Sequence, residues 1–581
     1  MLPNTNLLRR FISLFLLPMA LILVLSACGD DDPVSPGPDP DPEPELNLAE
    51  TLAGESEYST LVSIVPEGLL DALETDELTV FAPTNAAFEN IPSEVLESLT
   101  EEEITLIITY HLVAGTIMSG DVPTQGDVET VQGELILVQS GNGVTINGSS
   151  DVVEADITAS NGVIHGINEV LLPSDIRKAL GATNLVDIAE EAGGFETLLS
   201  AVENAGLKTT LQFLGPFTTF APSDDAFNNL PDGTLESLSA EELVSILTYH
   251  VVDGAVMSTD LSAQQAVPSL QGDNLYIEVN GGVVINGSSS VEAADIEATN
   301  GVIHAVDAVL FPDAFGTIVD NAVKRFDFST LVGAVTDAGL ADALMADGPY
   351  TVFAPTNEAF SNLPDGLLES LTMEQLTEIL LYHVIEGDVT SGDLDAQQAV
   401  STLSGEAVYV TANGGVTING SSSVVAADVD ASNGTIHAID EVLIPNSFLN
   451  IVEIAQKNYE LTTLVDLVIA ADLAGTLSGE GPFTVFAPIN AAFEDISEAL
   501  QGLTEDQVTE TLTYHVIADR IESGDIPAGE TMIETVNGQS VTINNSNGSV
   551  TVDGANVITV DLGGTNGVIH LIDAVILPEF N

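Results

Sequence analysis

The sequence predicts an α+β protein built from four tandem copies of one domain, and three repeated phrases carry this prediction. A Phe-Ala-Pro phrase starts at Phe81, Phe220, Phe353 and Phe486, at intervals of 139, 133 and 133 residues. A Tyr-His pair ends at His111, His250, His383 and His515. An Asn-Gly-x-Ile-His phrase ends at His165, His304, His437 and His570. This period far exceeds that of a solenoid repeat, so each copy is expected to be a complete domain with its own core.

The first half of each copy predicts one short strand followed by helices. The run from Leu78 to Phe81 is apolar and β-prone, and the proline that follows ends it. Thr84 offers a helix start. A capping box then predicts the N-terminus of a longer helix that ends near His111. Its four copies are Thr100 with Glu103, Ser239 with Glu242, Thr372 with Gln375, and Thr504 with Gln507.

The second half of each copy is rich in β-prone residues. Tight turns between strands are predicted at Asn142-Gly143, Asn280-Gly281, Asn413-Gly414 and Asn547-Gly548. A last strand is expected from Val163 to Leu172, closing at Pro173. Helices first and strands afterwards indicate an α+β fold. The joins between copies are short, which favours a semi-rigid rod.

The first 27 residues have the layout of a secretory signal. Arg9 and Arg10 precede a fifteen-residue apolar run from Phe11 to Leu25, and small residues lead to Cys28, the single cysteine of the chain. Leu25-Ser26-Ala27-Cys28 resembles the lipobox of bacterial lipoproteins, which implies acylation of Cys28 and cleavage before it. An uncleaved membrane anchor, or an ordinary signal with a chance cysteine, is the alternative. Residues 28–45 are acidic and Pro-rich and predict an unfolded linker.

These features divide the chain as follows: 1–27 signal peptide, 28–45 linker, 46–174 first domain, 181–313 second, 314–446 third, and 447–581 fourth.

The charge is extreme and excludes several functions. The chain has 9 Lys and Arg against 89 Asp and Glu. Such a surface repels nucleic acid and anionic lipid heads. Two interpretations remain open: solubility in a saline habitat, or weak binding of divalent cations at the acidic surface.

Catalytic and metal chemistry find little support in the sequence. The two histidines of each copy are 54 residues apart (55 in the last), and neither a HExxH helix nor a close ligand pair occurs. There is no Gly-x-Ser-x-Gly elbow and no Gly-Lys-Ser/Thr phosphate loop. We therefore expect no catalytic residue, cofactor or metal, and we interpret the histidines as buried structural residues rather than ligands.

The three phrases together resemble the fasciclin (FAS1) domain family, in order and spacing, in all four copies. The resemblance implies a β-wedge packed with several α-helices, and extracellular roles in adhesion and matrix attachment. In animal relatives, adhesion maps to Asp-Ile segments and to the region around the Tyr-His pair. The matching positions, as partner-binding or structural residues, are Tyr110, His111, Asp156, Ile157, His165, Tyr249, His250, Asp295, Ile296, His304, Tyr382, His383, Asp428, His437, Tyr514, His515, Asp561 and His570. In the third and fourth copies Val429 and Leu562 replace the isoleucine.

The leading functional hypothesis is therefore an exported, lipid-anchored, non-catalytic binding protein on the cell surface or the periplasmic face of a bacterial envelope. Its partner would be an extracellular protein or polysaccharide, and four domains would give avidity. The alternatives are a structural spacer of the envelope and, least favoured, an enzyme with an unrecognised site.

Overall fold

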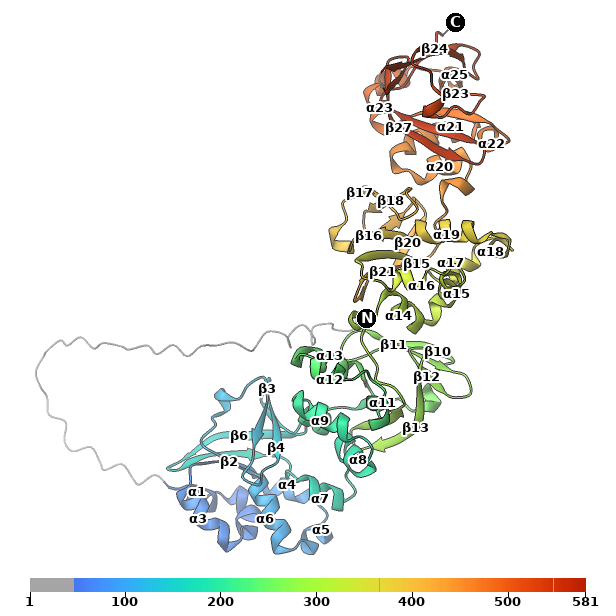
Figure 1. The fold of residues 1–581 in the computed structure, drawn as a ribbon. Coiled ribbons are helices and arrows are strands. Elements are labelled where there is room, and N and C mark those ends of the chain that lie inside the picture. Colours follow the sequence, from blue (N-terminus) through green and yellow to red (C-terminus); the bar gives the residue numbers. More distant parts are fainter. Residues whose placement is uncertain (1–45, 365, 547, 581) are drawn as a thin grey trace, which may run out of the picture.

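A computed structural model describes residues 46–580 apart from positions 365 and 547. The signal segment, Cys28 and the acidic linker therefore lie outside the described residues, as does Asn547 of the fourth predicted turn. Figure 1 shows four folded units that follow one another along the chain, each with a β-sheet and a set of helices. Within the described part of the chain, no helix is long and apolar enough to cross a bilayer.

The first domain begins with helices, as the sequence predicts. Its helices are α1 (Leu48–Gly54), α2 (Ser59–Ile64), α3 (Glu67–Thr75), α4 (Asn85–Glu89), α5 (Ser93–Ser98) and α6 (Glu101–Tyr110). Thr84 caps α4, and the Thr100–Glu103 capping box starts α6, which His111 terminates. The capping boxes also start the equivalent helices α13 (Ala240–Tyr249), α19 (Met373–Tyr382) and α25 (Glu505–Tyr514).

Seven strands form the sheet of the first domain. They are β1 (Leu78–Pro83), β2 (Leu112–Ala114), β3 (Gln125–Glu129), β4 (Leu135–Ser140), β5 (Val144–Ile146), β6 (Ser150–Ala159) and β7 (Gly162–Ile167). Their order is β2-β1-β7-β6-β5-β4-β3, and the other three domains repeat it. β1 and β7 are parallel over six residue pairs, whereas the other neighbours are antiparallel. A single bridge between Val113 and Thr130 joins the two edges and curls the sheet into a wedge.

Each sheet packs against two apolar clusters. In the first domain, Leu48, Leu61 and Ile164 belong to a cluster between the helices and β1 and β7. Phe81 and Ile136 belong to a second cluster inside the curled sheet. Hydrophobic residues on both sides of the central strands explain why β1 and β7 are buried along nearly their whole length.

The prediction of a last strand up to Leu172 is wrong. β7 ends at Ile167. The Asn168 N–H still donates to Asp151 O at 3.1 Å, and Leu171 N–H then donates to the His111 ring at 2.9 Å. The chain thus leaves the sheet to cover the end of α6, because that helix end offers a buried acceptor.

The first join differs from the other two. An additional helix, α7 (Ser174–Ala179), is inserted between the first and second domains and has six residues. It accounts for the first interval of 139 residues where the later ones are 133. The following domains begin with α8 (Leu185–Ala192), α14 (Ile318–Lys324) and α20 (Ile451–Lys457).

Candidate functional site

The histidine of each Tyr-His pair is a buried strut between a helix end and the segment after the last strand. His111 is 1 % exposed. Its Nδ1 donates to Ile107 O at 2.7 Å, and its Nε2 accepts from Leu171 N–H at 2.9 Å. Burial lowers the pKa of His111 to about 4, so the ring is neutral. The same pattern holds at His250, His383 and His515.

The last histidine of each copy joins the Asp-Ile segment to the sheet. His165 is 3 % exposed and stacks on Phe81 at 5.7 Å between ring centroids. Its Nε2 donates to Ile117 O at 2.8 Å, and its Nδ1 accepts from Asp156 N–H at 3.2 Å. The equivalent contacts recur at His304, His437 and His570. Both nitrogens are used in every histidine, so no ring lone pair remains for a metal.

The aspartate of the Asp-Ile segment forms a rigid, partly exposed turn. Asp156 has a φ of 61° at an irregularity in the pairing of β6 with β7. Its carboxylate accepts from Ser119 N–H at 2.8 Å and from the Ser119 hydroxyl at 2.5 Å. These bonds hold the pKa of Asp156 below its usual value. Asp295, Asp428 and Asp561 bind Ser258, Ser391 and Ser523 in the same way.

In the first three domains the tyrosine of the pair lies at a different place, at the end of the domain that meets the next one. The Tyr110 hydroxyl donates to Leu135 O at 3.3 Å and accepts from the Asn147 amide at 3.3 Å. Burial raises the pKa of Tyr110 to about 12. The structure therefore does not bring Tyr110 together with Asp156. Within one domain, His111 is buried at a helix end, Asp156 lies in a partly exposed turn, and Tyr110 lies at the end of the domain.

Sequence reasoning missed the role of the few basic residues. Seven follow the signal segment: Arg177, Lys178, Lys208, Lys324, Arg325, Lys457 and Arg520. All but Arg520 lie where two consecutive domains meet. At the first junction, Arg177 donates to Leu172 O at 2.7 Å and approaches the buried Asp187 at 3.4 Å. Glu190 binds both Lys178 (2.9 Å) and Lys208 (3.3 Å).

The second and third junctions use cations in the same way. Lys324 donates to Phe311 O at 3.0 Å, and the Arg325 guanidinium lies 5.1 Å above the Tyr276 ring of the second domain. Lys457 donates to the Tyr382 hydroxyl at 3.0 Å and lies over that ring. Burial lowers the pKa of Lys457 to about 8. The position of the junction cations in the sequence could have indicated this role. Apart from Lys208, they all follow Pro173, Pro312 or Pro445 by at most thirteen residues.

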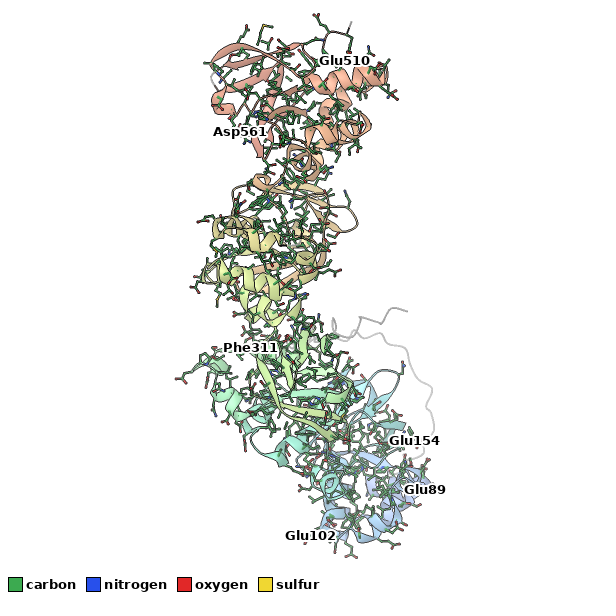
Figure 2. All side chains as sticks on the ribbon, turned by 90° about the vertical axis from the view of Figure 1, so that its right-hand side faces the viewer. Glu89, Glu102, Glu154, Phe311, Glu510 and Asp561 are labelled. Atoms are coloured by element: carbon green, nitrogen blue, oxygen red, sulfur yellow. The ribbon has the colours of Figure 1, made fainter. Side chains whose placement is uncertain are left out.

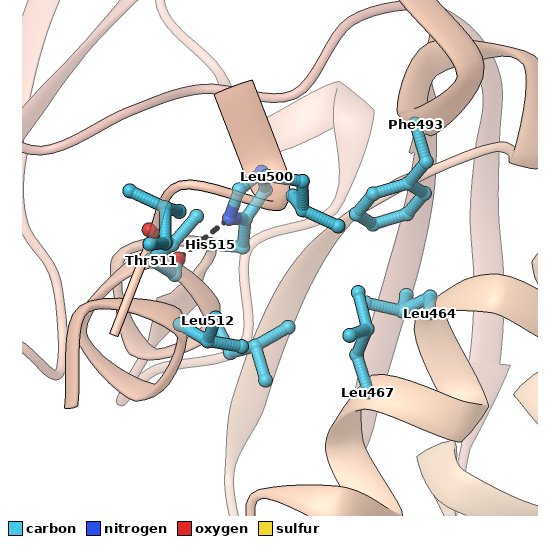
Figure 3. A pocket seen from close by; sticks show the side chains of 9 residues that line it. Leu464, Leu467, Phe493, Leu500, Thr511, Leu512 and His515 are labelled. Atoms are coloured by element: carbon cyan, nitrogen blue, oxygen red, sulfur yellow. Dashed lines mark hydrogen bonds between the residues drawn. The ribbon is translucent and has the colours of Figure 1, made fainter. Parts of the chain in front are cut away.

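The cavities of the described residues are small and apolar. Figure 3 shows one of about 10 Å³ in the fourth domain, where Leu500, Phe493 and Leu464 surround it and His515 is bonded to Thr511 O. Another holds about 140 Å³, in the third domain beside Leu340 and His383. Ligand pockets usually hold about 300–1,000 Å³. The described residues contain no group of three His, Cys, Asp or Glu arranged to hold a metal ion.

Carboxylates cover the outside of the domains instead. Figure 2 shows Glu102 and Glu510 on the exteriors of the first and fourth domains, and Phe311 where the second domain ends. The candidate site is thus a partly exposed Asp turn that occurs once in each of the four acidic domains. Basic side chains join these domains at the junctions.

Comparison with known proteins agrees with this architecture. The fasciclin domain model matches residues 56–173, 193–312, 326–445 and 459–578. The chain is 30% identical to transforming growth factor-beta-induced protein ig-h3 of Sus scrofa over 551 residues, covering 92% of this chain and 78% of that protein. It is 28% identical to human periostin, over 86% of this chain and 60% of periostin. It is 44% identical to protein sll1483 of Synechocystis, over 27% of this chain and 89% of that protein.

Among solved structures, a FAS1 domain pair from the insect cell adhesion molecule fasciclin I is similar at 20% identity, with a TM-score of 0.34. The match covers 44% of this chain and 97% of that structure. Four family matches in register with four seven-stranded sheets confirm the fold expected from the repeated phrases. The chain belongs to the fasciclin family, with four FAS1 domains in tandem.

Proposed function

We propose that this chain is an exported, lipid-anchored, non-catalytic binding protein that attaches to an extracellular protein or polysaccharide. The observation that carries the proposal is the Asp turn, which recurs four times in the same geometry and is partly exposed each time. A ligand with repeated epitopes can engage several such turns, and avidity then exceeds the affinity of one domain. The histidines are buried and fully bonded, which favours a structural role over catalysis.

The binding test uses the chain from Cys28 to the end, incubated with whole cells and with matrix polysaccharides. A variant with all four aspartates replaced by asparagine (Asp156, Asp295, Asp428 and Asp561) should lose retention far more than any single replacement. Asparagine keeps the size of the side chain and removes the charge.

The matched control removes the same number of charges elsewhere. Glu102, Glu241, Glu374 and Asp506 are exposed in the first turns of α6, α13, α19 and α25, and their amide variants should retain binding. Equal loss in both fourfold variants would mean that only general acidity matters. Absence of binding by the unmodified chain would leave the spacer as the better function.

The spacer has its own support. Basic side chains bonded at all three junctions oppose bending between domains. A protein that only holds another molecule away from the membrane would need this stiffness. The two functions are compatible, because a stiff spacer also presents the Asp turns away from an anchor.

Anchoring is proposed from Cys28 and the apolar run before it. Two or three acyl chains would hold the chain stably, since each buried methylene contributes about 0.8 kcal/mol. Cys28→Ser should move the protein from the membrane fraction to the soluble fraction and abolish acyl labelling. A variant that stays with the membranes would contradict the lipobox.

A further inference from the structure

Three features recur together at each junction between domains. The tyrosine of the Tyr-His pair ends at the junction, next to an asparagine in the left-handed conformation: Asn147, Asn286 or Asn419. The glycine after that asparagine lies against a backbone carbonyl of the next domain. A Cβ at Gly148, Gly287 or Gly420 would stand 2.7, 3.0 or 3.2 Å from Phe213 O, Val323 O or Gln456 O. A basic side chain completes the contact.

The fourth domain carries the same face, but the described residues do not cover it. We call Tyr514, Asp553, Gly554 and Leu577 the terminal face. A Cβ at Gly554 would have no atom within 4 Å. Leu577 is 45 % exposed, whereas its equivalents Leu172, Phe311 and Ile444 are partly buried. Figure 1 shows α20 at the end of this domain that meets the third domain, with β24 (Gly529–Glu534) at the opposite end.

Two substitutions move the negative charge of the terminal face to a new position. Asp553 stands where the other domains have asparagine, and it keeps the left-handed backbone with a φ of 47°. The Tyr514 hydroxyl donates to Asp553 Oδ2 at 2.6 Å. Burial raises the pKa of Tyr514, and the hydrogen bond to Asp553 and its charge raise it further. At the three junctions an asparagine amide takes the place of Asp553, and the nearby carboxylate comes from Glu134, Asp273 or Glu406 instead. The fourth domain has Gln539 at that second position, so Asp553 supplies the negative charge next to Tyr514.

We propose that the terminal face is a docking surface for a lysine or arginine side chain carried by a protein other than this chain. The occupied third junction shows the mode of binding: Lys457, the last residue of α20, places its ammonium group 3.0 Å from the Tyr382 hydroxyl and 4.9 Å from the ring centroid. At the third junction Glu406 lies 4.0 Å from the Lys457 ammonium group, and at the terminal face Asp553 would supply the carboxylate, which gives charge complementarity.

The described part of this chain has no cation to offer. Six of its seven basic residues already lie at the junctions, and Arg520 donates to Gly564 O at 2.8 Å and to Gly567 O at 3.0 Å. A second copy is a poor partner as well. The first helices of the first and third domains align, because Leu48 N–H and Ile318 N–H each donate to an asparagine side chain at the same place. In this alignment the first domain has Gly54 and Glu55 where the third domain has Lys324 and Arg325. Head-to-tail stacking would bring Glu55 towards Asp553, and like charges repel.

This inference rests on the proposed binding function and narrows it to one face and one partner chemistry. The probe is a fluorescent peptide with the sequence of residues 446–461, which contains the whole of α20, titrated into the chain from Cys28 to the end at low salt. We expect saturable binding that Asp553→Asn weakens about fivefold, the size of a partly exposed charge pair. Asparagine is the native residue in the other three domains, so the variant should fold.

Three controls make the result decisive. Glu494→Gln removes a charge from an exposed position of α23 (Asn490–Asp495) and should leave the affinity unchanged. A peptide with Lys457→Gln should not bind. Carbodiimide cross-linking should join the peptide lysine to Asp553 in preference to other carboxylates.

Equal weakening by Asp553→Asn and Glu494→Gln, or cross-links spread over the surface, would overturn the inference. Cross-links from Asp553 to a lysine of a second copy would also overturn it, because the partner would then be this chain itself. The cell-binding assay separates the two proposals. If the fourfold Asp-turn variant loses retention while Asp553→Asn has neither peptide nor cell phenotype, the binding function stands and the terminal face fails.

Discussion

The surroundings of each histidine determine its role in this protein. The two histidines of a domain look alike in sequence, yet His111 braces a helix end and His165 holds the Asp turn. The first of these is completely enclosed, and its neutral form is the one that fits two opposite hydrogen bonds. Protonation would place an unpaired charge in the core, which costs far more than the bonds contribute.

This burial predicts a loss of stability in mild acid. His111, His250, His383 and His515 have pKa values lowered to about 4 in the folded chain, against an ordinary 6.5. The unfolded chain therefore binds more protons between these values, so stability is complete above about pH 6.5 and falls as the pH drops towards 4. The loss reaches roughly 3 kcal/mol per domain at most.

Urea unfolding at pH 7.0, 5.5 and 4.5 measures this loss, and proton uptake on unfolding identifies the groups. Asp156, Asp295 and Asp428 do not interfere, because their pKa values lie below the ordinary 3.8. A free energy of unfolding that stays constant from pH 7.0 to 4.5 would show that the histidines are not buried as neutral rings.

Between elements, a glycine at each junction leaves room for the backbone of the next domain. Gly148 has a φ of 72° and lies against Phe213 O, while Gly554 has a φ of 93° and faces open space. Alanine at either position incurs about 1 kcal/mol for the left-handed backbone. Only Gly148→Ala also forces the first and second domains apart, which adds about 1–3 kcal/mol.

Calorimetry and limited proteolysis test this pair of variants. Gly148→Ala should lower the unfolding temperature and expose residues 174–184 to cleavage, whereas Gly554→Ala should produce the smaller loss and no new cleavage site. If the two variants behave identically, the first junction is not closely packed in solution.

The helices were more predictable than the ends of strands or the junctions. A capping box is local chemistry: Thr100 and Glu103 satisfy each other's backbone amides whatever the surroundings. The residue at which β7 ends could not be predicted from its neighbours in the sequence, because it depends on the ring of His111, which accepts a hydrogen bond from a backbone N–H sixty residues away. The cations were counted correctly but not located, since their partners, such as Tyr382 for Lys457, belong to a different domain. The residues of the Asp turn were identified, but their bonds to Ser119 came only from the fold.

For the whole molecule, the balance of charge determines the response to salt. With 89 acidic residues against nine basic ones, repulsion between carboxylates opposes the compact state at low ionic strength. Screening becomes strong when the Debye length falls to about 3 Å near 1 M salt. We expect the unfolding temperature to rise smoothly from low salt towards molar NaCl, and equally in KCl.

Calcium distinguishes the two interpretations of the acidity. General screening gives a smooth rise, whereas a dedicated site gives a saturable step at low calcium that grows with the logarithm of free ligand. An unfolding temperature that is flat from about 10 mM to 2 M NaCl would remove the physical basis of the saline-habitat interpretation.

The parallel pairing of β1 with β7 has a mechanical consequence. In the first domain β1 follows the helices α1 to α3 and β7 is the last strand, and the two run side by side over six residue pairs from Leu78–Gly162 to Pro83–Ile167. If a tether holds one end of the protein while a bound surface pulls the other, the start of β1 and the end of β7 are drawn in opposite directions along the strands. The two strands are then pulled past each other, so the hydrogen bonds between them share the force and must break together rather than one at a time. Once the force reaches these strands, each domain therefore resists stretching along their common direction.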